Sequence, residues 1–193
     1  MRRISVAILA LALSCAGAYA QNPHLKWYGF VRSYFAYDSR ESTAGTEDLY
    51  FYMPKDENVV DGEDLNAIPS LRFAALTSRL GVDVLGYEVQ GYGIGAKIET
   101  DFYSGVSGVT GTAQLRLRQA YVTIEKAGRK WKVGQAWHPM AADLPDIFSL
   151  ESGAPFNAFS RTPQVTIEYA FTKAWSFTGS ALWQMQYCSA GLP

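Results

Sequence analysis

The sequence predicts an all-β protein, an antiparallel transmembrane β-barrel of which about seven strands are present. Three observations lead to this fold class. Polar and apolar residues alternate with a period of two from Leu25 onward, without a sustained helical period. Long connections alternate with short turns, and aromatic residues lie near both ends of the apolar faces. Such a chain is expected to cross a membrane with strands.

The N-terminus has the three parts of a secretory signal peptide. Arg2 and Arg3 supply the positive charge, residues 4–13 form the apolar region, and Ala18 and Ala20 form a small-x-small cleavage site. The apolar run is shorter than the roughly 20 residues of a spanning helix. We therefore expect a cleaved signal peptide over residues 1–20 and the N-terminal part of a barrel domain over residues 21–193.

Composition and motifs exclude several classes of protein. The 193 residues carry a net charge of -1 and 48% of them are hydrophobic, which excludes disorder and gives no electrostatic case for binding nucleic acid. The chain has no metalloprotease, phosphate-loop, dinucleotide-binding or serine-hydrolase motif, and His24 and His138 stand apart. We expect no enzymatic activity, no cofactor and no metal site. Cleavage would leave Cys188 as the single cysteine, so no internal disulfide could form.

Strand-like alternation occurs in segments bounded by Gly, Pro, Ser and Asp. These segments are residues 25–38, 72–84, 92–102, 114–125, 130–137, 164–171 and 175–187. Their apolar faces contain, in chain order, Trp27, Val31, Phe35 and Tyr37; Ala74, Leu76, Leu80 and Val82; Tyr92, Ile94, Ala96, Ile98 and Phe102; Leu115 and Leu117; Trp131, Val133 and Trp137; Val165, Ile167, Tyr169 and Phe171; and Trp175, Phe177, Ala181 and Trp183. The alternation blurs from Gln119, which predicts a bulge or a register switch in the fourth segment.

The connections assign the two ends of the sheet. Long loops over residues 39–71, 103–113 and 138–163 are expected at one rim, and short turns over residues 85–90, 126–129 and 172–174 at the other. The first loop is acidic and is expected to be a solvated surface loop. Tyr50, Phe51 and Tyr52 within it suggest that part of this loop packs or extends a strand.

Aromatic spacing favours a membrane barrel over a soluble sandwich. A strand tilted by about 45° climbs about 2.3 Å per residue, so the segment from Tyr92 to Phe102 spans about 23 Å. That height matches the apolar band of about 25 Å between the aromatic girdles of outer-membrane barrels.

In a barrel the ionic faces would line water, because a charge that faces lipid near the midplane costs about 2–4 kcal/mol. The predicted pore-lining cations are Arg32, Arg79, Lys97, Arg116, Arg118, Lys130 and Lys132, and the predicted pore-lining anions are Asp83, Glu99, Asp101 and Glu168. This excess of positive charge would favour anions. Arg116 and Arg118 have two interpretations: a step in an anion path, or a structural pair that balances Glu99 or Asp101 on the neighbouring strand.

Four stretches resemble a known family. "KWYGFVRSYFAYDSRES", "EDLYFYMPKD", "RLRQAYV" and "VGQAWHP" are similar to the N-terminal part of Gram-negative trimeric porins, of the DcaP-like type in Bacteroidetes and more distantly the phosphate-selective porins. The resemblance implies a passive outer-membrane channel for small hydrophilic solutes, a homotrimer surrounded by outer-membrane lipid and lipopolysaccharide. In general porins the third external loop narrows the lumen, which by resemblance would place Asp143, Asp146 and Glu151 at the constriction.

The length is short for a complete porin. Seven antiparallel strands cannot close a barrel, because the first and the last point the same way. Residues 25–187 supply about 23 residues per strand, so a barrel of roughly sixteen strands would need about 370 residues. We expect a fragment with two open edges. Two alternative functions remain open: a non-transport outer-membrane surface binding protein, and a secreted soluble β-sandwich module.

Overall fold

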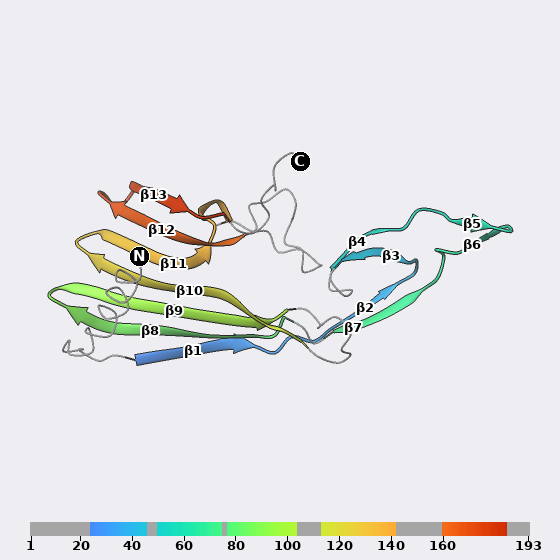
Figure 1. Cartoon of the computed structure of the whole chain (residues 1–193), viewed down its shortest axis with the longest axis horizontal. Helices are drawn as coiled ribbons and strands as arrows, with labels where there is room; N and C mark the ends of the chain where they lie inside the picture. Colours follow the sequence, from blue (N-terminus) through green and yellow to red (C-terminus); the bar gives the residue numbers. More distant parts are fainter. Residues whose placement is uncertain (1–23, 46–49, 75–76, 104–112, 142–159, 185–193) are drawn as a thin grey trace, which may run out of the picture.

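The structure, a computed structural model, describes residues 24–45, 50–74, 77–103, 113–141 and 160–184. These residues form one antiparallel sheet and a narrow arm that projects from one end of it (Figure 1). The seven strands of the sheet are β1 (His24–Phe30), β8 (Arg79–Val89), β9 (Tyr92–Phe102), β10 (Leu115–Lys126), β11 (Arg129–Trp137), β12 (Arg161–Ala170) and β13 (Ser176–Leu182), in that spatial order. Apart from the arm, which lies between β1 and β8, each strand pairs with the next one along the chain.

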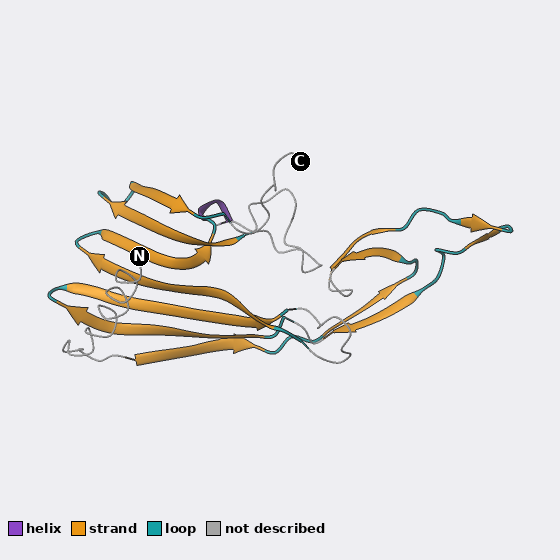
Figure 2. Ribbon diagram, viewed as in Figure 1, coloured by secondary structure: helices purple, strands orange, loops and turns teal. Residues whose placement is uncertain are grey.

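The arm consists of three short ladders that follow one another outward from the sheet (Figure 2). They pair β2 (Tyr34–Asp38) with β7 (Ser70–Ala74), β3 (Ser42–Gly45) with β4 (Tyr50–Pro54), and β5 (Val59–Val60) with β6 (Glu63–Asp64). Much of residues 39–71 is therefore not an irregular loop, because parts of it pair as short strands. Most of its described residues from 53 onward are exposed, as expected for a solvated segment. The expectation that Tyr50, Phe51 and Tyr52 extend a strand is confirmed, since all three lie in β4.

Ion pairs stabilise the arm. Arg40 donates a hydrogen bond to the Asp64 carboxylate, and Lys55 pairs with Glu41. The second oxygen of Asp64 accepts the backbone N–H groups of Asn58 (2.9 Å) and Asn66 (3.0 Å). These contacts satisfy backbone donors that a two-residue ladder leaves unpaired.

The predicted third strand matches β9 residue for residue, and the fourth to sixth match β10, β11 and β12 to within a few residues. The first predicted strand is divided, because β1 ends at Phe30 and residues 34–38 belong to the arm. The seventh prediction extends past Leu182, where β13 ends, and its residues beyond 184 lie outside the described part of the chain.

The second predicted strand is wrong in its bounds. Buried Thr77 has a left-handed φ of 66°, which interrupts the chain between β7 and β8. β8 then continues to Val89, so most of the expected turn at 85–90 is strand. A register shift between Val84 and Tyr87 accommodates one extra residue of β8 beside Gly86, whose φ is 80°.

Two tight hairpins define the turn end of the sheet. Gln90 and Gly91 connect β8 to β9 with φ values of 52° and 74°, and Ala127 and Gly128 connect β10 to β11 with 49° and 74°. Positive φ at both central residues is the type I′ geometry, whose twist matches that of paired strands. The opposite end, from which the arm projects, is called the loop end below.

The two faces of the sheet differ in chemistry. Directly paired residues share a face, so the register places Asp83, Lys97, Tyr121 and Gly134 on one side, called the polar face. The other side, called the apolar face, carries among others Trp27, Val82, Ile98, Val122, Val133, Val165 and Ala181. β8 and β9 each have 11 residues and, tilted, span about 25 Å, the height of an apolar membrane band.

Burial is inverted relative to a soluble protein. Among the described residues, the buried apolar side chains are Ala36, Ala136 and Ala141, whereas the buried polar ones are Ser42, Thr77, Glu99, Asp101, Arg118, Ser160, Arg161, Thr162, Gln164 and Thr166. Large apolar residues such as Trp27, Ile98 and Val165 are exposed, and no second layer of described residues covers them. A soluble β-sandwich would bury this face against another sheet. No helix within the described ranges has the length and apolar character needed to cross a membrane.

Candidate functional site

The polar face carries an ion-pair lattice centred on β9. Asp101, only 1% exposed, receives Arg116 Nε on Oδ1 at 2.9 Å and Arg116 Nη2 on Oδ2 at 2.8 Å. Arg118 connects two acids, because its Nη1 donates to Asp101 Oδ2 and its Nε to Glu99 Oε1, both at 2.7 Å. Buried carboxylates require such partners, because an unpaired buried charge is strongly destabilising.

The lattice continues across β8 to β1. Tyr28 donates its hydroxyl proton to Glu99 Oε2 at 3.0 Å and accepts a hydrogen bond from Lys97 Nζ at 3.2 Å. Lys97 also pairs with Asp83 at 3.2 Å. Arg79 lies directly opposite Asp101 in the register, and its Nε is 3.9 Å from Glu99 Oε1. One network thus joins side chains from four neighbouring strands.

A β-bulge explains how Arg118 reaches both acids. The register shifts between Leu117 and Gln119, so Arg118 and Gln119 both point toward Glu99, which Gln119 Nε2 contacts at 3.3 Å. Gln135 Nε2 donates to the Leu117 and Arg118 carbonyls at 3.2 Å and 3.1 Å. The irregularity predicted at Gln119 is confirmed, and beyond it the strand regains its alternation with Tyr121, Thr123 and Glu125 on the polar face.

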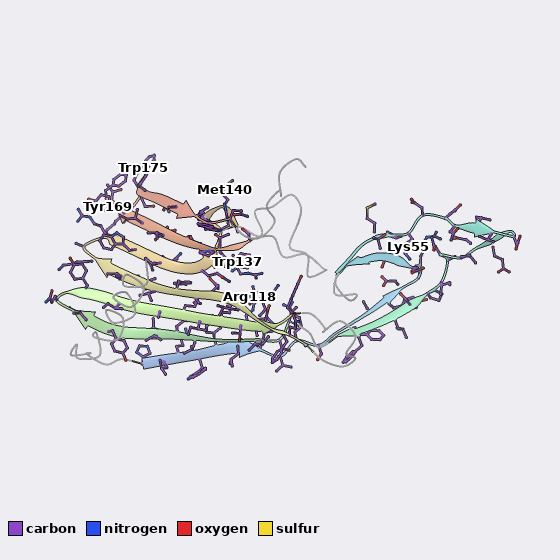
Figure 3. The ribbon with its side chains drawn as sticks, in the orientation of Figure 1. Lys55, Arg118, Trp137, Met140, Tyr169 and Trp175 are labelled. Atoms are coloured by element: carbon purple, nitrogen blue, oxygen red, sulfur yellow. The ribbon has the colours of Figure 1, made fainter. Side chains whose placement is uncertain are left out.

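The guanidinium groups of the arginines at the loop end lie over aromatic rings. Arg32 and Arg79 lie over Phe30, with 5.0 Å and 5.1 Å from guanidinium carbon to ring centroid. Arg116 lies over Tyr103 at 3.6 Å. Arg118 and Arg161 lie over Trp137 at 5.6 Å and 4.8 Å. We call these five residues, Arg32, Arg79, Arg116, Arg118 and Arg161, the arginine belt; Figure 3 shows Arg118 and Trp137 toward the loop end.

Inverted burial, an apolar face of membrane height and a charged opposite face characterise an outer-membrane barrel sheet. The family model described as "DcaP outer membrane protein" matches residues 15–172. The chain belongs to the DcaP outer membrane protein family. The resemblance to DcaP-like porins seen in the sequence is therefore confirmed.

A solved DcaP structure agrees with this assignment. The chain is similar to the outer membrane channel DcaP of Acinetobacter baumannii, with a TM-score of 0.58 and 26% sequence identity. The similarity covers 86% of this chain and 42% of that channel, so this chain spans less than half of the solved one. No curated protein matches the chain.

In the DcaP sheet, the residues predicted to line the pore share one face. Register pairs place Arg79, Asp83, Lys97, Glu99, Asp101, Arg116, Lys130, Lys132 and Glu168 on the polar face. Arg118 joins them through the bulge, and Arg32 lies just beyond β1 beside Phe30. Asp143, Asp146 and Glu151, predicted for the constriction, lie outside the described residues. The described residues contain no group of three or more His, Cys, Asp or Glu side chains arranged to hold a metal.

The sequence analysis did not assign Arg161 and did not predict the contacts of Trp137. Arg161 precedes Pro163 at the start of β12, and its position in the alternation would have placed it on the apolar side, yet it is buried against Trp137. Trp137 was predicted for the apolar face but contacts Arg118, which pairs with polar-face acids. Gly134 has a φ of 133°, a distortion near the end of β11 that alternation cannot reveal.

The turn end of the polar face is chemically different. Glu125 pairs with Lys130 at 2.6 Å, and Lys130 lies opposite Glu168 in the register. These side chains line an open groove of about 650 Å³ together with Thr178. The numbers of acidic and basic side chains around this groove are more nearly equal than in the arginine belt. Tyr169 and Trp175 lie at this end in Figure 3, as expected for an aromatic girdle.

Proposed function

We propose that the polar face lines the aqueous pore of a DcaP-type channel and that the channel passes small hydrophilic solutes by passive diffusion, with a preference for anions. The single observation that carries the preference is the arginine belt. Three of its guanidinium groups, those of Arg79, Arg116 and Arg118, lie around two acids, Glu99 and Asp101. Arg32 lies beside Arg79 over the Phe30 ring and adds to the positive charge of this surface. A water-filled slot with low-dielectric walls and excess positive charge concentrates anions.

The remaining features of the proposal come from the family. We propose a cleaved signal peptide over residues 1–20, a barrel region over residues 21–193, and a Gram-negative outer-membrane homotrimer in contact with lipopolysaccharide. Asp143, Asp146 and Glu151 would lie in a constricting loop and oppose the basic wall. The similarity to 42% of a solved channel supports a larger barrel to which this sheet contributes its first strands.

A bilayer measurement tests the proposal. The complete gene product is reconstituted in a planar bilayer under a KCl gradient, and the reversal potential gives the ratio of chloride to potassium permeability. We expect a ratio above one. A ratio below one would contradict the anion preference, and a protein that inserts without conductance would favour a non-transport surface binding protein.

A further inference from the structure

Two exposed cations lie on the apolar face at the turn end of the sheet. Lys126 and Arg129 are the last residue of β10 and the first of β11, and they pair with each other across the hairpin turn. Alternation along the two strands places them on the same side as Val122 and Val133. Both side chains are exposed. These two charges therefore lie on the outer side of the sheet, away from the proposed pore.

No acidic residue balances these cations on their own side of the sheet. In the register of the seven described strands, every acid lies on the polar face, namely Asp83, Glu88, Glu99, Asp101, Glu125 and Glu168. On the apolar side the same register places three charged residues, Lys126, Arg129 and Arg161, and Arg161 is buried. The exposed charge of the apolar side is thus entirely positive and is confined to the β10–β11 hairpin.

The two cations retain hydrogen-bond donors. Lys126 Nζ donates to the Gln90 carbonyl at 3.0 Å and lies 3.9 Å from the centroid of the Tyr92 ring. The guanidinium carbon of Arg129 lies 5.3 Å from the centroid of the Tyr169 ring. Neither side chain forms an ion pair with an acid in the described part of the chain, although both border the groove that contains Glu125. An ammonium group has three donors and a guanidinium group five, so most of them remain for an acceptor outside the protein.

The apolar surface beside the cations has the polarity order of a phospholipid. Next to them on the same side lie Ile124 and Trp131, which are paired in the register, and then Val122 and Val133. Each two-residue step along a tilted strand is about 4.7 Å of membrane height. Charge at the end of the sheet is followed by apolar surface toward its middle, as a headgroup is followed by its acyl chains. Long Lys and Arg side chains cover apolar surface with their stems and keep the charge at the interface.

We propose that Lys126 and Arg129, flanked by Tyr92 and Tyr169, bind the phosphate of an anionic phospholipid whose acyl chains lie along the apolar side of β10 and β11. Two adjacent cations attract an anionic headgroup, whereas they repel the ammonium group of a zwitterionic one. The short turns of outer-membrane barrels face the periplasm, so the lipid belongs to the periplasmic leaflet. The site goes beyond the proposed pore function and depends only on the apolar face lying in the membrane.

The test uses the complete gene product in detergent, with three separate probes: phosphatidylglycerol, phosphatidylcholine with the same acyl chains, and inorganic phosphate. Native mass spectrometry measures the dissociation constant of each lipid. Lys126→Gln/Arg129→Gln removes both charges, and the exchange Lys126→Arg/Arg129→Lys keeps them. Lys130→Gln/Lys132→Gln is the matched control, because it removes two cations from the polar face of the same hairpin.

We expect the wild type to bind phosphatidylglycerol more tightly than phosphatidylcholine. Lys126→Gln/Arg129→Gln should weaken phosphatidylglycerol binding by about tenfold or more and leave phosphatidylcholine binding unchanged, because it removes two cations from the interface. The exchange variant should bind phosphatidylglycerol within about twofold of the wild type, since the charge is retained. The control variant should bind it as the wild type does.

Equal phosphatidylglycerol binding by the wild type and by Lys126→Gln/Arg129→Gln overturns the site. An equal loss in the control variant also overturns it, because net charge would then be the cause. Displacement of the lipid by inorganic phosphate at the same concentration would show a site for free phosphate and not for lipid. Conductance and reversal potential of the same wild-type preparation report the pore function separately, so either proposal can fail without the other. Heat-dependent migration on gels confirms that each variant has folded.

Discussion

Arg116 donates two parallel hydrogen bonds to Asp101, one from Nε to Oδ1 at 2.9 Å and one from Nη2 to Oδ2 at 2.8 Å. The carboxylate is almost completely buried, so its charge depends on this partner and on Arg118. Of the two interpretations that the sequence left open for this arginine pair, the contacts are those of a structural pair balancing Glu99 and Asp101. The proposed preference for anions then depends on the excess of positive charge over the whole belt, and not on Arg116 and Arg118 alone.

Removing Arg118 should therefore destabilise the sheet more than removing Arg116. The Arg118 side chain is 6% exposed and serves two acids, whereas that of Arg116 is 22% exposed and serves one. We expect Arg118→Gln to cost about 3 kcal/mol of unfolding free energy, because it leaves buried charge uncompensated, and Arg116→Gln about half as much. Urea unfolding in lipid vesicles measures both values. Equal costs would contradict a bridging role for Arg118.

Neighbouring residues on β10 should respond oppositely to a new charge. Val122 lies on the apolar face and Thr123 on the polar face. Val122→Arg would place a charge against lipid at a cost of about 2–4 kcal/mol, whereas Thr123→Arg would face water. The fraction of protein that folds into vesicles should fall for the first variant and remain near the wild-type level for the second. The reverse order would show that the two faces are wrongly assigned.

Gly81 provides the space that Tyr28 needs to reach Glu99. A Cβ at Gly81 would lie 2.2 Å from the Tyr28 ring, so Gly81→Ala should displace the ring and break its hydrogen bond to Glu99. We expect a loss of about 1–3 kcal/mol from this overpacking. Gly93→Ala is the control, because a Cβ there meets its nearest atom at 3.8 Å. Thermal unfolding should separate the two variants, and similar melting temperatures would rule out the packing argument.

The arm should tolerate acid to low pH. The hydrogen bond from Arg40, followed by the backbone N–H of Asn58, lowers the pKa of Asp64 from 3.8 to about 2. Because the folded pKa lies below the unfolded one, this ion pair contributes stability above about pH 4 and loses it as the pH falls through about 2. Carboxyl chemical shifts of Asp64 measured by NMR report the titration. Arg40→Gln should raise the midpoint toward 3.8, and an unchanged midpoint would remove Arg40 as the cause.

Much of the sheet follows from local pattern. Strict alternation identified β9 from Tyr92 to Phe102, and the interrupted alternation at Gln119 located the bulge that positions Arg118. Glycine and turn signals placed the hairpin at Gly128. A period of two is a property of each strand alone, so it assigns side chains to faces without knowledge of the neighbouring strands.

Pairing across the chain was decided only in three dimensions. The acidic stretch after Asp38 became an arm because β2 meets β7 some thirty residues later, a contact for which no local period gives a signal. Local sequence also does not determine which partner each charged side chain binds. Alternation allows Arg118 to pair with Glu99, with Asp101 or with neither, and the structure shows that it bridges both. The contacts of Trp137 with Arg118 and Arg161 likewise depend on tertiary structure, because both arginines lie on neighbouring strands. Register and side-chain partners depend on the energy of the whole sheet, whereas the face of each strand depends on its own sequence.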